Sequence, residues 1–363
     1  MERLLCILSS LNTGGAETFI MKIYRNIDRR RYQFDFIVAS SKRGFYEDEI
    51  EDKGGKIYHI PLHTKHPFKS FFEIKRIIKQ NRYDRVLKFC DTPLGITDLV
   101  AAKMGGAKIV AVRSCNAGSG SNTAKECVYN IIRPFFNRLA MIKIAPSKLA
   151  AEYTFGEKAA LSEVKYIHNG IDLEYYKYNE NARSVIRESL GIKNNQFVIG
   201  HVGRLNQQKN HKYLMDVFAE IHDKIDSMLL IVGDGELKES LTKYAEEKGI
   251  GNKTVFAGVQ SDIPAFLSAM DVFVFPSLYE GMPNTVIEAQ GTGLPCFVSD
   301  TITREANITD LVQYCSITAP PASWVEQIIK CNGLPRRNTS EQVRRSGYDI
   351  NETSKEFVSL LMK

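Results

Sequence analysis

The sequence predicts an α/β protein that contains two doubly wound units, one after the other. Short apolar runs rich in Val, Ile and Phe alternate with stretches of helical period along the whole chain. This alternation is typical of parallel sheets covered by helices. The chain has 363 residues, which is more than one hydrophobic core usually serves. We therefore expect two domains.

The first half of the chain supplies five expected strands and three clear helices. The helices are expected at 16–26, 68–80 and 94–104, where apolar residues recur at helical spacing. The strands are the apolar runs between them, at 3–10, 33–40, 56–61, 84–90 and 108–114.

The second half repeats the arrangement. The two units are expected to join at 166–176, where a strand ends in an Asn-Gly turn and a tyrosine-rich polar stretch follows. A loop at 333–340 precedes a final helix at 346–362. The strands of this half are expected at 196–203, 227–234, 254–258, 271–277 and 296–300.

Residues 271–290, DVFVFPSLYEGMPNTVIEAQ, carry the most information about function. The apolar run suits a strand buried on both faces, and Pro283 suits the first turn of the helix that follows. The first free backbone donors of that helix, at Asn284 and Thr285, lie at the carboxyl end of the strand. Open α/β sheets bind ligands at this edge, and helix N-termini attract phosphate. The segment therefore predicts an anion site.

Two glutamates flank this anion site, eight positions apart. Glu280 precedes the helix, and Glu288 lies one turn beyond Asn284 on the same face. One carboxylate can therefore meet a ligand from the loop and the other from the helix. The alternative is a solvated helix with two surface glutamates, which the preceding strand and the GLP turn at 293–295 disfavour.

The Glu-x7-Glu motif at 280–288 resembles that of the retaining glycosyltransferases of family 4, and so does the string PSLYEGMPNTVIEAQGTGLPCFVSD around it. The likeness covers nearly the whole chain and is closest to bacterial enzymes of capsule or exopolysaccharide synthesis. It implies the GT-B architecture, in which two Rossmann-like domains face each other across a cleft. It further implies an acceptor-binding domain at 1–170, a nucleotide-sugar-binding domain at 171–345 and a helix at 346–363 that crosses back to the first domain.

A second motif, GHVGRLNQQKN at 200–210, places Arg204 and Lys209 on a loop that follows a strand. Two cations without a nearby acid suit a diphosphate leaving group, because negative charge builds on it as the glycosidic bond breaks. A solvated basic loop is the alternative. The string resembles the family's G-R-L-x5-N pattern, which implies that both cations hold the donor diphosphate. The resemblance also implies that Glu280 contacts the donor sugar and Glu288 the ribose.

Two glycine loops are further candidates for the donor site. Gly14 and Gly15 lie between the first expected strand and helix, where glycine lets the backbone approach a ligand. Their loop resembles the family's amino-terminal Gly-Gly loop, and a plain tight turn is the alternative. Gly233, in VGDGELK, is expected to shape a loop of the donor site. Lys238 stands where a third glycine would complete G-x-G-x-x-G, so a nicotinamide enzyme is disfavoured.

Residues 110–118, VAVRSCNAG, depart from the family, many of whose members carry a His beside the reacting sugar. Arg113 and Asn116 are the candidates for contact with the acceptor or a phosphate, and a structural role for Arg113 is an equal alternative. The resemblance implies that no enzymic nucleophile is needed, because the acceptor can pass its proton to a phosphate oxygen. No Asp-x-Asp follows a strand to hold magnesium, so neither a metal nor another cofactor is expected.

The charge of the chain is uneven. Residues 1–170 hold 28 Lys and Arg against 17 Asp and Glu, whereas the remainder holds 20 against 25. No nucleic-acid-binding motif accompanies the basic half, so an anionic membrane surface or a lipid diphosphate is the better partner. The stretches 66–82 and 126–143 mix Phe and Ile with Lys and Arg, as interfacial helices do. Core-facing helices with basic outer faces are the alternative.

The seven cysteines are scattered and form no C-x-x-C pair, which indicates a reducing setting. The apolar run at 4–8 is too short for a signal peptide, and no run approaches the roughly 20 apolar residues that span a bilayer. We therefore expect a cytoplasmic protein at the inner face of the cell membrane.

Together these observations predict a retaining, metal-independent hexosyltransferase. Its donor is expected to be a nucleotide diphosphate sugar, with UDP favoured, and its acceptor a lipid-linked saccharide. Two alternatives stay open: an isomerase of the UDP-N-acetylglucosamine epimerase type, and a sugar-nucleotide-binding protein without activity.

Overall fold

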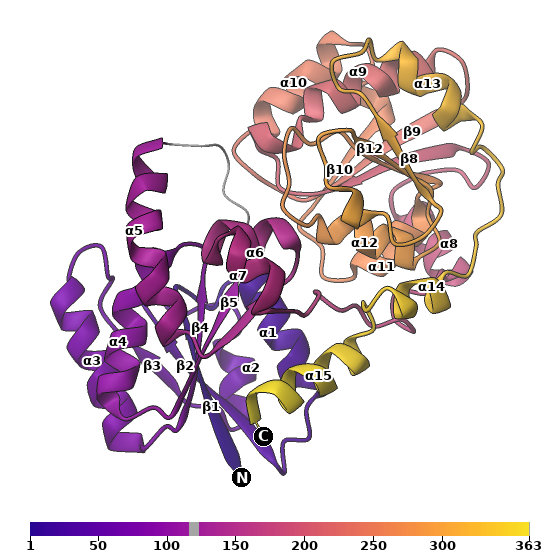
Figure 1. Ribbon diagram of the computed structural model, residues 1–363. Helices are drawn as coiled ribbons and strands as arrows, with labels where there is room; N and C mark the ends of the chain where they lie inside the picture. The colour runs from indigo at the N-terminus through magenta and orange to yellow at the C-terminus, as the bar shows by residue number, and fades with distance from the viewer. Residues whose placement is uncertain (116–122, 363) are drawn as a thin grey trace. The chain divides into compact units, whose positions relative to one another are not determined.

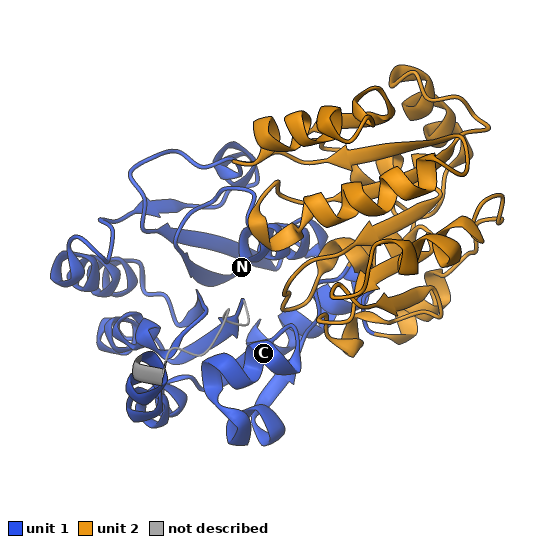
Figure 2. Cartoon of the chain, turned by 90° about the horizontal axis from the view of Figure 1, so that it is seen from above, with its two compact units in different colours: residues 1–170, 347–363 blue, residues 171–346 orange. Residues whose placement is uncertain are grey.

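The structure is a computed structural model that describes residues 1–115 and 123–362. The chain forms two compact units (Figure 2). Unit 1 consists of residues 1–170 and 347–363, and unit 2 of residues 171–346. Each unit contains one parallel sheet with helices packed on it, which confirms the predicted α/β class (Figure 1).

Unit 1 contains a seven-stranded sheet in the order β3-β2-β1-β4-β5-β6-β7. The strand order reverses on either side of β1, and the crevice at such a switch point is where open α/β sheets bind ligands. The strands are β1 (Glu2–Leu8), β2 (Tyr32–Val38), β3 (Ile57–His59), β4 (Arg85–Cys90), β5 (Ile109–Ser114), β6 (Ile142–Ala145) and β7 (Val164–Tyr166).

Both faces of this sheet are buried. In β1, Leu4 and Cys6 enter one hydrophobic cluster while Leu5 and Ile7 enter the other, as the period of two requires. The helices of unit 1 are α1 (Gly15–Asn26), α2 (Glu47–Asp52), α3 (Pro67–Asn81), α4 (Ile96–Gly105), α5 (Thr123–Leu139), α6 (Lys148–Phe155), α7 (Glu157–Ser162) and α15 (Ile350–Met362). The three helices expected in this half are therefore present, with ends shifted by one or two residues.

The stretch 126–143 is not one helical segment. Helix α5 ends at Leu139, and Ile142 already belongs to β6. The reason is pairing in the sheet, where Ile142 and Lys143 lie opposite Ala111 and Val112 of β5. The carboxyl end of the stretch is therefore core, and the expectation of a surface helix is wrong for that part.

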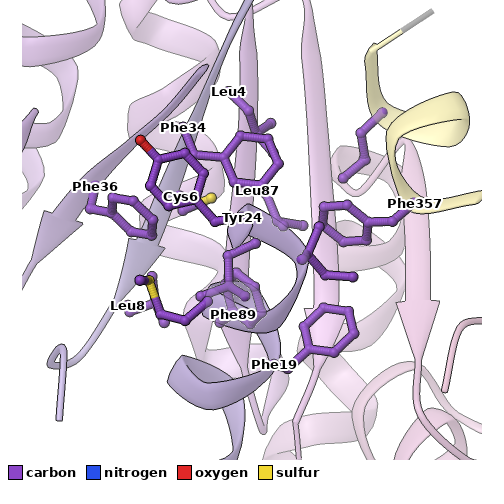
Figure 3. Packing of buried hydrophobic residues seen from close by; sticks show 14 of the residues in the cluster. Leu4, Cys6, Leu8, Phe19, Tyr24, Phe34, Phe36, Leu87, Phe89 and Phe357 are labelled. Carbon is purple, nitrogen blue, oxygen red and sulfur yellow. The ribbon is translucent and has the colours of Figure 1, made fainter. Parts of the chain in front are cut away.

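The last expected helix, 346–362, is present but begins four residues later than expected. Helix α14 (Ser340–Arg345) ends before Gly347, which has a φ of 79°, and α15 begins at Ile350. Backbone of that left-handed kind favours glycine and ends a helix. Helix α15 then packs on unit 1, where Phe357 meets Phe19 edge to face with ring centroids 5.6 Å apart (Figure 3).

Unit 2 contains a six-stranded sheet in the order β10-β9-β8-β11-β12-β13. Its strands are β8 (Phe197–Val202), β9 (Ser227–Val232), β10 (Thr254–Gly258), β11 (Val272–Phe275), β12 (Cys296–Ser299) and β13 (Val312–Cys315). Its helices are α8 (Glu180–Ser189), α9 (His211–His222), α10 (Lys238–Glu247), α11 (Ile263–Ala269), α12 (Asn284–Gly291), α13 (Ala322–Ile329) and α14. The edge strand β13 is one that the sequence patterns do not predict.

None of the helices in the described part of the chain is long and apolar enough to cross a membrane.

Candidate active site

The candidate site lies at the carboxyl edge of the unit 2 sheet. Strand β8 is flanked by β9 and β11, so the loops that follow these three strands emerge side by side. They carry, in chain order, Arg204 and Lys209, then Gly233, and then Glu280.

The loops after β8 and β9 are joined through their backbones. Leu205 N donates to Asp234 O at 3.0 Å, and Gly203 N donates to Val232 O at 2.9 Å. Gly233 has a φ of 134°, and a Cβ there would collide with the carbonyl oxygen of Gly203. Gly233 is therefore needed for close packing of the loop that presents Arg204, and its N–H donates to Gly258 O at 2.8 Å. Its contact with the donor stays a prediction.

Lys209 is the most enclosed cation of the site. Its Nζ lies 2.6 Å from Glu280 Oε1 and 4.5 Å from the centroid of the Phe275 ring. The side chains of Lys209 and Glu280 are only 15% and 10% exposed. The two predicted residues are thus brought together, and the face of Phe275 adds a cation–π contact.

The backbone holds this ion pair in place. Leu278 N donates to Gln208 O at 2.8 Å, and Gln208 Nε2 donates to Tyr279 O at 2.8 Å. The turn before Lys209 is fixed as well, because the Asn206 side chain accepts a hydrogen bond from Lys209 N. Hydrogen bonds therefore join the loops after β8 and β11 into one surface.

Arg204 is held much more loosely. Its guanidinium is 3.4 Å from Glu236 Oε2, and the two side chains are 72% and 56% exposed. Such an exposed pair restrains a side chain little. Arg204 can therefore reorient toward an anion at small cost.

Helix α12 begins next to this surface. Pro283 is its N-cap residue, and Asn284 and Thr285 are its first two residues, as the sequence predicts. The first amides of a helix point out of its N-terminus, which is a place where anions bind. On this helix Glu288 is half-buried, and it accepts a hydrogen bond from the Tyr176 hydroxyl. Burial, followed by the nearby Glu288 carboxylate, raises the pKa of Tyr176 well above its usual value.

Two buried histidines lie beneath Lys209. His201 Nδ1 donates to Val274 O at 2.9 Å, and its ring stacks on Phe275 with centroids 5.3 Å apart. The His211 ring meets that of His201 edge to face, with centroids 4.7 Å apart. Burial lowers the pKa of His201 well below 6.5, and burial and Lys209 lower the pKa of His211 to about 4. Both rings are therefore neutral near pH 7.

The glycine candidates of unit 1 lie at the start of α1. Gly14 is the N-cap residue, and a Cβ there would meet the Glu17 carboxylate, which also accepts a hydrogen bond from Ser10. Gly15 has open space where a side chain would project. The glycines thus leave the first turn of α1 accessible at the carboxyl edge of the unit 1 sheet.

Arg113 is buried, with 1% exposure, at the end of β5. Its guanidinium lies 3.5 Å from the centroid of Phe19 and donates to Asn169 Oδ1 at 2.7 Å and to Ile167 O at 3.3 Å. The structure therefore shows a link between β5 and the segment after β7, while a ligand contact of Arg113 stays a prediction. Asn116 lies outside the described residues.

Among the described residues, no group of three or more His, Cys, Asp or Glu is arranged to hold a metal ion.

Comparisons with known proteins connect this geometry to a family. Residues 182–346 match the family model of glycosyl transferases group 1, and residues 13–175 match that of glycosyltransferase family 4. A Bacillus subtilis protein named as the glycosyltransferase EpsF is 31% identical over 361 residues, covering 97% of this chain and 94% of its own. The chain belongs to this glycosyltransferase family. The group 1 match contains every candidate residue of unit 2, and the family 4 match contains Gly14, Gly15 and Arg113.

One further relative and one solved structure are also similar to this chain. An Escherichia coli UDP-Gal:alpha-D-GlcNAc-diphosphoundecaprenol alpha-1,3-galactosyltransferase is 30% identical over 283 residues, covering 74% of this chain and 72% of its own. The crystal structure of Anabaena Alr3699/HepE in complex with UDP superimposes with a TM-score of 0.77 at 18% identity, covering all of both chains. The fold is that of GT-B glycosyltransferases, with two Rossmann-like units.

Three residues that contact the predicted site residues are not predicted from the sequence. Phe275, Tyr176 and Glu236 contact the predicted Lys209, Glu288 and Arg204, respectively, but nothing in the spacing of the sequence marks them. Phe275 could have been predicted, because it is the last residue of a buried strand and such a residue lies next to the ligand-binding loops at that edge.

Proposed function

We propose that this glycosyltransferase is a retaining enzyme that transfers a hexose from a UDP-sugar to a lipid-linked saccharide. One observation carries the proposal. Lys209 and Arg204 lie on the loop after β8, α12 begins four residues after Glu280 on the loop after the neighbouring β11, and Lys209 pairs with Glu280. Cations and a helix N-terminus at one edge of a sheet suit a diphosphate.

The chemistry follows from these charges. When the bond between the anomeric carbon and the diphosphate oxygen breaks, its electron pair stays on the diphosphate, which Lys209 and Arg204 stabilise. The acceptor hydroxyl forms the new bond on the same face, and its proton passes to a phosphate oxygen. We propose that no metal is required, because two side-chain cations and helix amides already face the developing charge.

The relatives support the choice of substrates. The name of the Escherichia coli relative includes UDP-Gal and a diphosphoundecaprenol acceptor, and the Anabaena structure contains UDP. By similarity, UDP is the proposed nucleotide and a lipid diphosphate saccharide of polysaccharide synthesis the proposed acceptor.

Unit 1 offers surfaces for a membrane that carries such an acceptor. Phe68 and Phe72 of α3 are 81% and 61% exposed, and Ile131 and Phe135 of α5 are 71% and 65% exposed. The same two helices also carry Lys and Arg residues, and residues 1–170 have an excess of positive charge. Exposed apolar residues among cations suit a peripheral contact with an anionic lipid surface, on the cytoplasmic side.

The test has two parts. Calorimetric titration with UDP-glucose, UDP-galactose, UDP-N-acetylglucosamine and GDP-mannose identifies the donor, and we expect UDP-sugars to bind best. Incubation of that donor with a synthetic GlcNAc-diphosphate-lipid, with excess EDTA present, is expected to give a product whose anomeric configuration is retained by NMR. Formation of an epimer from the donor alone would indicate an isomerase, and binding of UDP-sugars without any turnover would indicate a non-catalytic protein.

A further inference from the structure

The two cations of the candidate site are not in the same state. Lys209 already has a protein anion at 2.6 Å, in a pair whose side chains are 85% and 90% covered. Arg204 has only a distant and exposed partner in Glu236. A ligand anion therefore finds Arg204 available, whereas the ammonium of Lys209 is neutralised by Glu280.

This neutralisation is built into the loops. Glu280 follows Tyr279, whose carbonyl accepts from Gln208, the residue before Lys209. The Phe275 ring supports the ammonium from below, and the stem of Lys209 passes beside Gly203, where a Cβ would lie 3.3 Å from Lys209 Cε. Neither side chain can change rotamer without losing these contacts. The pair is therefore more restrained than an exposed surface ion pair.

We propose that Glu280 is an internal counter-ion that competes with the ligand's phosphate for Lys209, and that it thereby favours the intact nucleotide sugar over the free nucleoside diphosphate. The inference rests on the proposed function, which brings a diphosphate to Lys209. A diphosphate must displace the carboxylate or share the ammonium with it, and two anions close together repel each other. This competition weakens the binding of any diphosphate.

A sugar changes the balance. Once displaced, the Glu280 carboxylate can only accept hydrogen bonds, and the hydroxyls of a hexose next to the diphosphate can donate them. The nucleotide sugar therefore gives the carboxylate a new partner, whereas UDP alone leaves it unpaired in a partly desolvated place. Glu280 thus weakens the binding of UDP, the product, more than that of the donor.

The experiment is calorimetric titration of wild type, Glu280→Gln and Asp216→Asn with UDP and with the UDP-sugar that wild type binds best. Glu280→Gln removes the charge at nearly constant shape. We expect it to bind UDP about three- to tenfold more tightly than wild type, the size of one charge-assisted contact, and to lose preference for the UDP-sugar by a similar factor. Asp216→Asn is the matched control, because Asp216 pairs with Lys248 at the same 2.6 Å but lies on α9, outside the site residues.

Other results would overturn the proposal. If Glu280→Gln binds UDP no more tightly than wild type, or if Asp216→Asn gains as much affinity, Glu280 is not a specific competitor. If Glu280→Gln fails to fold, Glu280→Asp, whose shorter side chain keeps the charge but loosens the 2.6 Å contact, is titrated in its place, and a gain in UDP affinity is again expected. Failure of wild type to bind UDP at all would instead contradict the proposed function.

Discussion

Lys209 of unit 2 and Arg113 of unit 1 are cations at equivalent places, near the carboxyl ends of parallel strands. Lys209 lies on a loop, pairs with a carboxylate and keeps 15% of its side chain exposed. Arg113 is buried under Phe19 and donates to carbonyl and amide oxygens. A cation at this edge can therefore be available to a ligand or can stabilise the fold, and its partners and exposure indicate which of the two roles it has.

The largest effect is expected for Lys209→Ala. Removing the ammonium from the diphosphate site should lower turnover about tenfold or more, because a charge-assisted contact to the leaving group is lost. The melting temperature should also fall, because the mostly covered Glu280 carboxylate loses its partner, so turnover is compared at a temperature where the variant remains folded. Steady-state kinetics and thermal unfolding measure the two quantities. A variant with normal turnover would remove Lys209 from the mechanism.

The opposite pattern is expected for Arg113→Met. The free energy of unfolding should fall by about 2 kcal/mol, because Asn169 and Ile167 lose their donors in a buried place. UDP affinity should stay within about twofold of wild type, as small changes away from a binding contact do. Chemical denaturation and calorimetry give both values. If stability is kept while the KM for the acceptor rises, Arg113 contacts the ligand after all.

Acid should destabilise the surroundings of Lys209 in particular, because the two buried histidines lie next to Lys209. The folded pKa of His211, about 4, is below the ordinary value of 6.5, so between these values the unfolded chain binds a proton that the folded chain does not. The free energy of unfolding should therefore fall as pH drops from 6.5, by about 1.4 kcal/mol per pH unit for one such group. Denaturation of wild type and His211→Gln at pH 7 and pH 5 measures this. An unchanged difference in the variant would show that His211 is not responsible.

The smallest effect is expected for Glu236→Gln. Its contact with Arg204 is 3.4 Å long and exposed on both sides, so UDP affinity should change by about twofold or less. The titration used for Glu280→Gln serves here as well. A gain as large as that expected for Glu280→Gln would mean that both cations carry internal counter-ions and that burial does not distinguish them.

Local patterns predict much of the fold. The apolar runs of β1, β8 and β11 are bounded by turns and are buried at nearly every position, as strands covered on both faces are, so their place and type can be predicted. The outer strands of the two sheets, at or next to an edge, are harder to predict. Strands β6 and β13 have four residues each and are strands because a neighbour pairs with them, which is a property of the sheet and not of the segment.

The candidate site divides in the same way. Arg204, Lys209 and Glu280 lie on recognisable motifs, and the topology brings the last two within 2.6 Å. Tyr176 is far from Glu288 along the chain, and no rule of spacing joins them. Sequence reasoning also leaves the role of Arg113 open between ligand contact and structure, because burial under Phe19 depends on how α1 and α15 pack.

The return of α15 to unit 1 has a consequence for biosynthesis. Phe357 is fully buried in the cluster that contains Phe19 and Phe34, so the first half of the chain cannot complete its core until residues past 357 have left the ribosome. Unit 2, encoded in between, is finished earlier. A nascent chain therefore carries an open apolar face throughout most of its synthesis, and a stalled or clipped product would present that face to chaperones and proteases.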